Sequence, residues 1–313
     1  MLVSEVGETG LLRLIAERLP AGSEEIWAGD DAAVLAPVAG RSLFATDTMV
    51  EGVDFSLSYC TGADVGWKTV AVNVSDIAAM GGTPAKALTT LCLPPSTDMA
   101  FVESFLDGLI EAAATYGVDL VGGDISSAPV ITSGLAVTGT LDGAPWLRSG
   151  ARAGDALLVT GSLGGSHTGL EELSADPNAS GPAVERHLRP RARLAESAAL
   201  RSLAVSAAID LSDGLVVDLG RLMRASGTGC QVDPAAIPVD AAADGLGSAL
   251  FGGEDFELLV AIHQDHVTGA VAAVEGCGTT LTQIGVVTEG RALIGDDALE
   301  TMEEKAWDHL QSR

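Results

Sequence analysis

Residues 207–224 read AAIDLSDGLVVDLGRLMR, and this stretch decides the fold more than any other part of the chain. An apolar run ends at Asp210, Ser212 and Asp213 follow, and a helical pattern begins immediately afterwards. The pattern predicts a strand that leads into a helix, with carboxylates at the junction. Such a junction places side-chain oxygens beside the unpaired N–H groups of the first helical turn, which suits a phosphate held through divalent metal ions.

Acidic residues recur at similar places along the chain, beside glycines or at the ends of short apolar runs. They are Asp30 and Asp31 in GDDAAVL, Asp47 in LFATD, Asp76 in VNVSDIAAMGG, Asp124 in LVGGD, and Glu254 and Asp255 in FGGEDFELL. Any one of them alone is more often a helix cap than a ligand. Several adjacent negative charges in apolar surroundings are costly unless cations neutralise them. We therefore interpret the set as a multi-metal phosphate-transfer site.

The composition excludes several classes of function. With 313 residues, 47% of them hydrophobic, the chain suffices for one large domain or two medium ones. It has no apolar run long enough to span a membrane and no signal-peptide pattern, so we expect a cytoplasmic protein without membrane contact. A formal net charge of −26, with only 17 lysines and arginines, argues against nucleic-acid binding. The four scattered cysteines predict neither a zinc site nor a redox motif.

The predicted elements mix strands with helices that cover them, which is an α+β arrangement. We expect helices over 11–19, 64–80, 98–116 and 191–203, a helix after Asp213, and strands over 33–35, 43–46, 118–121, 131–141, 256–262 and 282–287. In the helix over 98–116, we expect Phe105 and Leu109 to face inward. The turn-rich RSGARAGD, residues 148–155, separates the two halves. We therefore expect domains at residues 1–147 and 148–313.

The chain lacks a lysine-containing phosphate loop. The glycine-rich GSLGGSHTG, residues 161–169, has no lysine, and no protein-kinase motif occurs. This segment fits a plain turn between strand and helix, and it equally fits a nest of N–H groups that contacts phosphate. Carboxylates that hold several Mg²⁺ ions can replace the missing lysine, because the metals bridge phosphate oxygens and offset the charge that develops during transfer.

The ordered motifs resemble the thiamine-monophosphate kinase family of the aminoimidazole-ribonucleotide-synthetase-like superfamily. They are GDDAAVL, TDTMVEGVDF, AVNVSDIAAMGGTP, LVGGD, RSGARAGD, HLRPRAR, AIDLSDGLVVDL and GGEDFEL, and the similarity extends from about Ile26 to the C-terminal WDHL. The resemblance implies an N-terminal metal- and ATP-binding domain whose sheet pairs across a homodimer, and a C-terminal α/β sandwich. It further implies phosphorylation of thiamine monophosphate to the diphosphate, with ATP as co-substrate and several Mg²⁺ ions.

The resemblance also implies roles for individual residues. The implied Mg²⁺ ligands are Asp31, Asp47, Asp76, Asp124, Asp210 and Asp213, with an oxygen from Thr46, and the catalytic members are Asp47, Asp76 and Asp213. The implied nucleotide contacts are Tyr116, Gly123, Asp124, Arg148 and Ser212, and the implied acceptor contacts are Asp54, Glu254 and Trp307. Members often have histidine where Asp54 stands, so either the substrate contact has changed or this charge attracts the thiazolium ring. His187, in HLRPR, either has a purely structural role or helps to orient a phosphate-facing loop.

The acceptor of such a reaction is itself a phosphate, so the nucleophile is already an anion and needs no strong base. In-line positioning and metal neutralisation would then supply catalysis. The alternatives within the superfamily are aminoimidazole-ribonucleotide synthetase, selenophosphate synthetase and the carbamoyl-dehydrating hydrogenase maturation factor. The last two usually carry a cysteine in an N-terminal glycine-rich loop or at the C-terminus, whereas the first cysteine here is Cys60 and the sequence ends QSR. A non-catalytic nucleotide- or metal-binding regulator is the alternative from another class.

Overall fold

The computed structural model describes residues 1–19, 25, 32–33, 35–37 and 40–303. The chain forms two compact units: unit 1 comprises Met1–Ile77 and Gly82–Gly143, and unit 2 comprises Ala78–Gly81 and Ala144–Arg313. The domain limits at residues 1–147 and 148–313 stay a prediction. The two compact units do not follow them in full, because the short segment Ala78–Gly81 belongs to unit 2. The predicted site residues Asp31 and Trp307 lie outside the described residues. Among the helices described, none is both long and apolar enough to cross a membrane.

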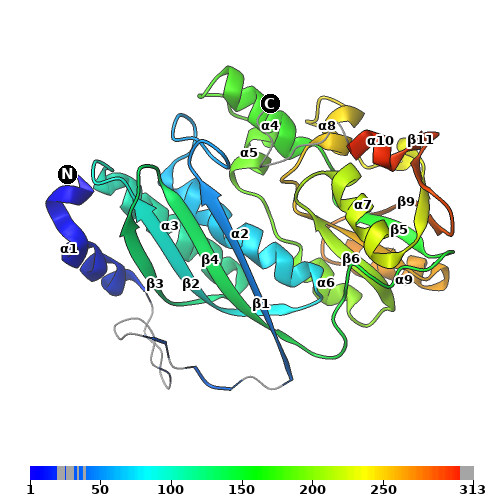
Figure 1. The fold of residues 1–313 in the computed structure, drawn as a ribbon, viewed down its shortest axis with the longest axis horizontal. Coiled ribbons are helices and arrows are strands. Elements are labelled where there is room, and N and C mark those ends of the chain that lie inside the picture. Colours follow the sequence, from blue (N-terminus) through cyan, green and yellow to red (C-terminus); the bar gives the residue numbers. More distant parts are fainter. Residues whose placement is uncertain (20–24, 26–31, 34, 38–39, 304–313) are drawn as a thin grey trace. The chain divides into compact units, whose positions relative to one another are not determined.

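Unit 1 is a sheet with helices on one face (Figure 1). Its elements are α1 (Val3–Arg18), β1 (Arg41–Val50), α2 (Gly62–Ala79), β2 (Thr83–Leu93), α3 (Met99–Tyr116), β3 (Asp119–Ser127) and β4 (Thr132–Leu141). The four strands lie in the order β1-β4-β2-β3. Strands β1 and β2 pair antiparallel with β4, and β3 pairs parallel with β2. Strands β1 and β3 are therefore the two edges of this sheet.

Glycines let the helices α2 and α3 approach each other closely. A Cβ at Gly66 would lie 2.1 Å from the carbonyl oxygen of Phe105, and a Cβ at Gly108 would lie 1.9 Å from that of Ala63. Neither helix could move this close with a larger residue at those positions. The side chains of Phe105 and Leu109 are 0% and 1% exposed, which confirms the inward face that the apolar spacing predicts for α3.

Unit 2 is built on a mixed sheet of seven strands in the order β11-β10-β7-β9-β5-β8-β6. Its strands are β5 (Ala156–Thr160), β6 (Val205–Leu211), β7 (Gly229–Val232), β8 (Glu257–Ile262), β9 (Leu281–Thr288), β10 (Ala292–Ile294) and β11 (Asp297–Ala298). Its helices are α4 (Gly165–Ala175), α5 (Pro182–Leu188), α6 (Leu194–Leu200), α7 (Leu215–Ser226), α8 (Leu246–Phe251), α9 (Val267–Glu275) and α10 (Leu299–Glu303), with 3₁₀ turns η1 (Pro234–Ala236) and η2 (Gln264–His266).

The sheet of unit 2 is buried on both faces. In β5, Leu157 and Val159 enter the core that contains the apolar side of α7, whereas Ala156 and Leu158 enter the core that contains residues of α6 and α9. Successive strand residues point to opposite faces, so a strand covered on both sides is a continuous apolar run. The segments ALLVT and ELLVAI have this form. Unit 2 is therefore an α/β sandwich, and the α+β class of the whole chain is confirmed.

Two local predictions differ from the structure. The apolar runs predict strand ends at Asp47 and Asp124, but the structure places both residues inside strands. Strand β1 continues past Asp47 because it pairs with β4 along its whole length, and a polar side chain that stands perpendicular to the sheet does not interrupt backbone pairing. The strand predicted around 33–35 is wrong for the described residues 33 and 35, which have no strand pairing.

Candidate active site

In unit 1, the polar face of α2 holds the backbone of β1 at Asp47. The Asp47 N–H donates to Oδ1 of Asn73 at 2.7 Å, and Nδ2 of Asn73 donates to the Asp47 carbonyl oxygen at 3.4 Å. Asn73 is fully buried, and it satisfies backbone groups on the outer side of an edge strand. Asp76 lies one helical turn further along α2, on the same face as Asn73. The predicted ligands Asp47 and Asp76 therefore belong to the same edge of the sheet.

Strand β3 carries the predicted ligand Asp124 at the opposite edge. The register across the sheet runs from Asp47 through Leu135 and Thr89 to Gly123. With ~4.8 Å between neighbouring strands, Asp47 and Gly123 are roughly 14 Å apart. Two carboxylates at that separation do not reach one Mg²⁺ ion, whose oxygen ligands lie at about 2.1 Å. As metal ligands, Asp47 and Asp124 of one chain belong to different ions.

Gly123 has a structural reason to be glycine. A Cβ there would lie 1.9 Å from the Thr89 carbonyl oxygen of the neighbouring strand β2. The register of β2 and β3 also shifts between Ala87 and Leu88, just before this point. Close packing of the two strands thus accounts for the glycine, and a nucleotide contact at Gly123 stays a prediction. Thr46 and Asp47 are adjacent in β1, so their side chains point to opposite faces of the sheet.

Three other predicted contacts have local roles in the structure. Tyr116 ends α3, and its ring packs against Trp67 with the ring centroids 5.9 Å apart. Asp54 accepts a hydrogen bond at 2.7 Å from the backbone N–H four residues earlier, in the turn that follows β1. Arg148 is exposed, and its carbonyl oxygen accepts a hydrogen bond from Ser226 at 2.9 Å. Binding of nucleotide or acceptor by these three residues stays a prediction.

In unit 2, a buried carboxylate organises the loop between β6 and α7. Asp210, at 6% exposure, lies one residue before the end of β6, and Ser212 and Asp213 form the loop. Asp218, in the first turn of α7, accepts hydrogen bonds from the N–H groups of Ser212 at 3.1 Å and Asp213 at 2.9 Å. Burial of Asp218 is the main cause that raises its pKa to about 7, and the charge of Asp213 adds to it. Asp218 thus holds the backbone of this loop.

Arg221 connects the same carboxylates. Its Nη1 donates to Asp213 and, at 2.8 Å, to Oδ1 of Asp218. Asp213 is therefore oriented by an arginine as well as by the bond from its own N–H to Asp218. The motifs of the sequence assigned no role to Asp218 or Arg221, although both lie within residues 207–224. Their spacing of three residues on one helix was the signal that could have identified the pair.

The segment 252–256 bends back onto this loop. The N–H of Glu254 donates to the carbonyl oxygen of Ser212 at 2.7 Å, and a Cβ at Gly253 would lie 2.5 Å from that same oxygen. Glu254 and Phe256 have φ values of 66° and 50°. Such conformations cost a non-glycine residue on the order of 1 kcal/mol or more, and they cluster at functional sites. The DLSDG and GGEDF motifs therefore form one structural unit.

Asp255 points to the glycine-rich segment. Its carboxylate accepts hydrogen bonds from the N–H groups of Gly164 at 2.7 Å and Ser166 at 3.3 Å, at the start of α4. Burial is the main cause that raises the pKa of Asp255 to about 7, and these hydrogen bonds oppose the rise. The segment GSLGGSHTG is thus a strand-to-helix turn in which a carboxylate of the same chain already binds N–H groups at Gly164 and Ser166.

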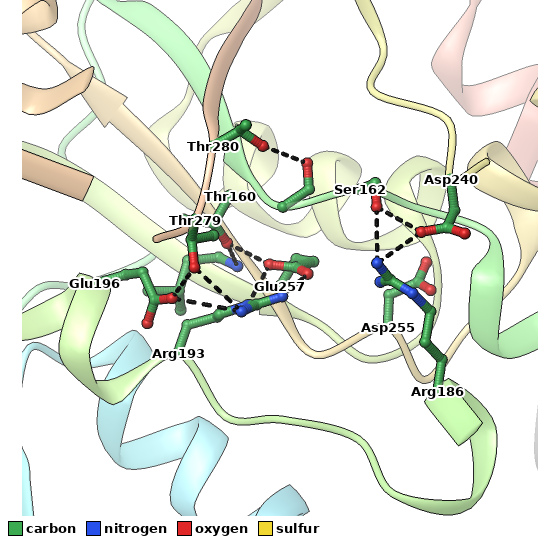
Figure 2. A network of polar contacts seen from close by, with 12 residues as sticks. Thr160, Ser162, Arg186, Arg193, Glu196, Asp240, Asp255, Glu257, Thr279 and Thr280 are labelled. Atoms are coloured by element: carbon green, nitrogen blue, oxygen red, sulfur yellow. Dashed lines mark hydrogen bonds and ion pairs between the residues drawn. The ribbon is translucent and has the colours of Figure 1, made fainter. Parts of the chain in front are cut away.

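A buried arginine network supports the base of the GGEDF segment (Figure 2). Arg193 donates from Nε to Glu257 at 2.6 Å and from Nη2 to the other oxygen of that carboxylate. Its Nη1 also bonds to Glu196 and Thr279, at 3.4 Å each. Thr160 donates to Glu257 at 2.7 Å. Burial raises the pKa of Glu257, and the charge of Arg193 opposes that rise, so the pair offsets part of the cost of removing this carboxylate from water.

A second arginine lies on the other side of Figure 2. Nη2 of Arg186 bonds to Ser162 at 3.1 Å and to Asp240 at 2.7 Å, and Ser162 donates to Asp240 at 2.6 Å. The charge of Arg186 also opposes the raised pKa of Asp255. The sequence contains Arg193 in the motif HLRPRAR, and its partner Glu196 is only three residues away, but Glu257 and Asp240 come from segments distant in the chain, which the local pattern does not indicate.

The donor set fits magnesium by its chemistry. In the described part of the chain, no three His, Cys, Asp or Glu side chains gather to hold a metal ion. Mg²⁺ is commonly bound by one or two carboxylates together with water and substrate phosphates, so it does not require an all-protein cage. Asp210 with Asp213 in unit 2, and Asp47 with Asp76 in unit 1, are oxygen donors of that kind.

Family sequence models match both halves of the chain. The model described as "AIR synthase related protein, N-terminal domain" matches residues 29–141, and "AIR synthase related protein, C-terminal domain" matches residues 152–297. A solved Escherichia coli HypE structure is 22% identical with a TM-score of 0.75, covers 91% of this chain and 92% of that one, and shows the shared fold alone.

Curated relatives share one description. The thiamine-monophosphate kinase of Escherichia coli K12 is 38% identical over 91% of this chain and 92% of that protein. The thiamine-monophosphate kinase of Aquifex aeolicus is 34% identical over 99% of this chain and 100% of that protein. The crystal structure of thiamine-monophosphate kinase from Stenotrophomonas maltophilia K279a is 30% identical, covers 94% of this chain and 98% of that one, and has a TM-score of 0.84. A structure described as AaThiL complexed with AMPPCP and TMP is 33% identical, covers 95% of each chain, and has a TM-score of 0.75. The chain belongs to the AIR synthase related family and, within it, to the thiamine-monophosphate kinase family.

Proposed function

We propose that this protein transfers the γ-phosphoryl group of ATP to thiamine monophosphate and so forms thiamine diphosphate. The observation that carries the proposal is similarity over almost the full chain to thiamine-monophosphate kinases, one of which is described in complex with AMPPCP and TMP. The geometry of unit 2 supports it, because the DLSDG and GGEDF motifs form one structural unit through the bond between Glu254 and Ser212.

The reaction needs positioning more than it needs a base. The attacking group is a phosphate oxygen of thiamine monophosphate, which is already ionised near neutral pH. Asp47 with Asp76, and Asp210 with Asp213, would hold Mg²⁺, whose positive charge would offset the charge that develops in direct in-line transfer. Asp218 and Arg221 would keep Asp213 oriented toward the ions.

The site residues that the resemblance implies keep their roles in this proposal. The proposed Mg²⁺ ligands are Asp31, Asp47, Asp76, Asp124, Asp210 and Asp213, with Thr46. The proposed nucleotide contacts are Tyr116, Gly123, Asp124, Arg148 and Ser212, and the proposed acceptor contacts are Asp54, Glu254 and Trp307. A negatively charged acceptor side is chemically reasonable, because the thiazolium ring of the substrate is a cation. We propose that the protein works in the cytoplasm, because that compartment supplies ATP.

The proposal includes a homodimer formed through the sheet of unit 1. Phe44 and Leu88 are 74% and 44% exposed, and by the strand register they point to the face away from the buried residues Leu135 and Val137. Large apolar side chains on an open sheet face favour burial against a partner. Sedimentation of the wild type and of Phe44→Asp tests this part. A dimer that becomes a monomer supports it, and a wild-type monomer overturns it.

The activity is tested by incubating the purified protein with ATP, Mg²⁺ and thiamine monophosphate and separating the products by chromatography. Thiamine diphosphate and ADP in equal amounts are expected. ATP consumption without thiamine diphosphate would favour another activity of the superfamily. Saturable binding of ATP without any turnover would favour a regulator.

A further inference from the structure

A buried histidine contacts the strained glutamate of the GGEDF segment. His187, in α5, has a side chain only 2% exposed. Its Nδ1 lies 3.2 Å from Oε2 of Glu254 and 3.3 Å from Oγ of Ser166. A buried imidazole needs hydrogen-bond partners, and a carboxylate oxygen is a strong one when Nδ1 carries the proton. The two contacts fix the ring of His187 against the start of α4 and the Glu254 side chain.

Glu254 occupies a backbone conformation that glycine would adopt without strain. Its φ is 66°, its N–H is bonded to Ser212 at 2.7 Å, and its side chain is 29% exposed. A strained backbone at a non-glycine residue persists only where its surroundings hold it, and it is a reason to look for a function of the side chain. The carboxylate of Glu254 is thus partly open to solvent while His187 holds it from the buried side.

Ser166 joins this contact to the rest of the turn. Its N–H donates to Asp255 at 3.3 Å, and its hydroxyl lies beside His187. The neighbouring carboxylates Asp255 and Glu257 already have their own partners in Gly164 and Arg193. The three acidic residues of the segment thus contact different groups, and His187 is the group that contacts the carboxylate of Glu254 at 3.2 Å.

We propose that His187 is a positioning residue that holds the Glu254 carboxylate for the cationic acceptor and takes no part in ATP binding. The inference rests on the proposed function, since the thiazolium ring of thiamine monophosphate is the cation in question. A glutamate side chain loses rotamer freedom when it binds a ligand, and a group that restrains it beforehand lowers that cost. Losing His187 should therefore weaken acceptor binding and leave the nucleotide side unchanged.

The test compares two substitutions at this position. His187→Phe keeps the bulk of the ring without a hydrogen-bond donor, and His187→Asn keeps an N–H donor close to the place of Nδ1. For His187→Phe, we expect the KM for thiamine monophosphate to rise about 10- to 100-fold, the usual effect of losing a hydrogen bond to a charged group. We expect the KM for ATP and kcat to change less than about 3-fold, and His187→Asn to restore most of the loss.

A double-mutant cycle shows whether the effect passes through Glu254. Glu254→Gln alone should raise the KM for thiamine monophosphate, and adding His187→Phe to it should cause little further change. The exposed His266→Asn is the matched control and should leave all constants unchanged. If His187→Phe does not fold, His187→Gln, which has no nitrogen at the Nδ1 position, takes its place with the same expectation.

The outcomes separate the two proposals. Wild-type protein that does not phosphorylate thiamine monophosphate overturns the proposed function, and the inference falls with it. With an active wild type, the inference alone is overturned by an equal rise in both KM values, by a loss of kcat without a rise in the acceptor KM, or by additive effects of His187→Phe and Glu254→Gln.

Discussion

Asp47 on β1 and Asp124 on β3 occupy the two opposite edges of the four-stranded sheet, with β4 and β2 between them. Asn73 anchors the Asp47 backbone to α2, whereas Asp124 pairs in register with Thr90 of β2. Asp47 and Asp124 are thus at separate positions, so we expect these two residues to serve different metal ions. Substitutions at the two edges can therefore be interpreted independently.

Substituting Asp47→Asn, Asp76→Asn or Asp213→Asn is expected to lower kcat by roughly 10²-fold or more, because each removes charge from a proposed metal position with little change of shape. Thermal stability should stay the same or rise slightly in the variants of Asp47 and Asp76, since carboxylate repulsion is relieved in the metal-free protein, whereas Asp213→Asn also weakens the pairing with Arg221. Steady-state kinetics and melting curves measure both effects. The exposed Asp142→Asn is the control. Wild-type activity in all three variants at limiting Mg²⁺ would contradict the metal assignment.

ATP binding should depend strongly on a divalent cation. The chain has 17 lysines and arginines against 43 aspartates and glutamates and lacks a lysine-containing phosphate loop, so metals must neutralise the polyphosphate. Calorimetric titration with ATP is expected to show binding with Mg²⁺ and none with EDTA. Equal affinity under both conditions would instead assign the phosphates to basic residues near Arg148 and Arg189.

Free thiamine should be a very poor acceptor. Its hydroxyl must lose a proton during attack, and base assistance is typically worth ~10²–10⁴ in rate, whereas the monophosphate oxygen arrives deprotonated. The comparison of kcat/KM for thiamine and thiamine monophosphate measures this difference. Chiral thiophosphate at the γ position of ATP should be transferred with inversion. Retention, or a trapped phosphoenzyme, would mean that an aspartate acts as a covalent carrier.

The buried pair of Arg193 and Glu257 should be costly to break but tolerant of joint replacement. Arg193→Met leaves the Glu257 carboxylate buried without its cation, a change that typically costs about 3–5 kcal/mol of unfolding free energy. Adding Glu257→Leu should recover much of that loss. Urea unfolding of both variants measures it. Arg291→Met, at an exposed pair with Glu300, is the control and should cost less than about 1 kcal/mol. If Arg193→Met is no less stable than the control Arg291→Met, the pair of Arg193 and Glu257 does not stabilise the fold.

Asp255 should make the protein less stable as pH rises. Its folded pKa is raised to about 7 from 3.8, so the folded state binds more protons than the unfolded state between these values. The stabilising contribution is complete below pH ~4 and is lost as pH rises through ~7. Asp255→Asn keeps one acceptor oxygen, which suffices for the 2.7 Å bond from the Gly164 N–H, and removes the titration. Urea unfolding at pH 5 and pH 8 measures how far the free energy of unfolding falls between these pH values. We expect this fall to be smaller in the variant than in the wild type, by on the order of 2 kcal/mol. Parallel falls in both proteins would contradict the assignment.

The pattern of residues by itself predicts the elements that local periodicity determines. The helix over 98–116 follows from apolar spacing, and its end at Tyr116 follows from Gly117, which has a φ of 67°. The buried strands β5 and β8 follow from unbroken apolar runs, because both faces of their sheet are covered. The motifs also predict the class of chemistry, since recurrent carboxylates without a phosphate-binding lysine favour metal-assisted phosphate transfer, and the role of the metal stays a prediction.

Only the tertiary structure decides which groups meet. Asp255 binds the N–H of Gly164 across 91 positions of sequence, and His187 in α5 contacts Glu254 of a separate segment. Within this acidic segment, Asp255 binds N–H groups at the start of α4 and Glu257 pairs with Arg193. The carboxylate of Glu254 is held toward solvent. Local sequence could not distinguish these roles, because the partner of a buried carboxylate is set by the packing of distant segments and by the requirement that each buried polar group be satisfied.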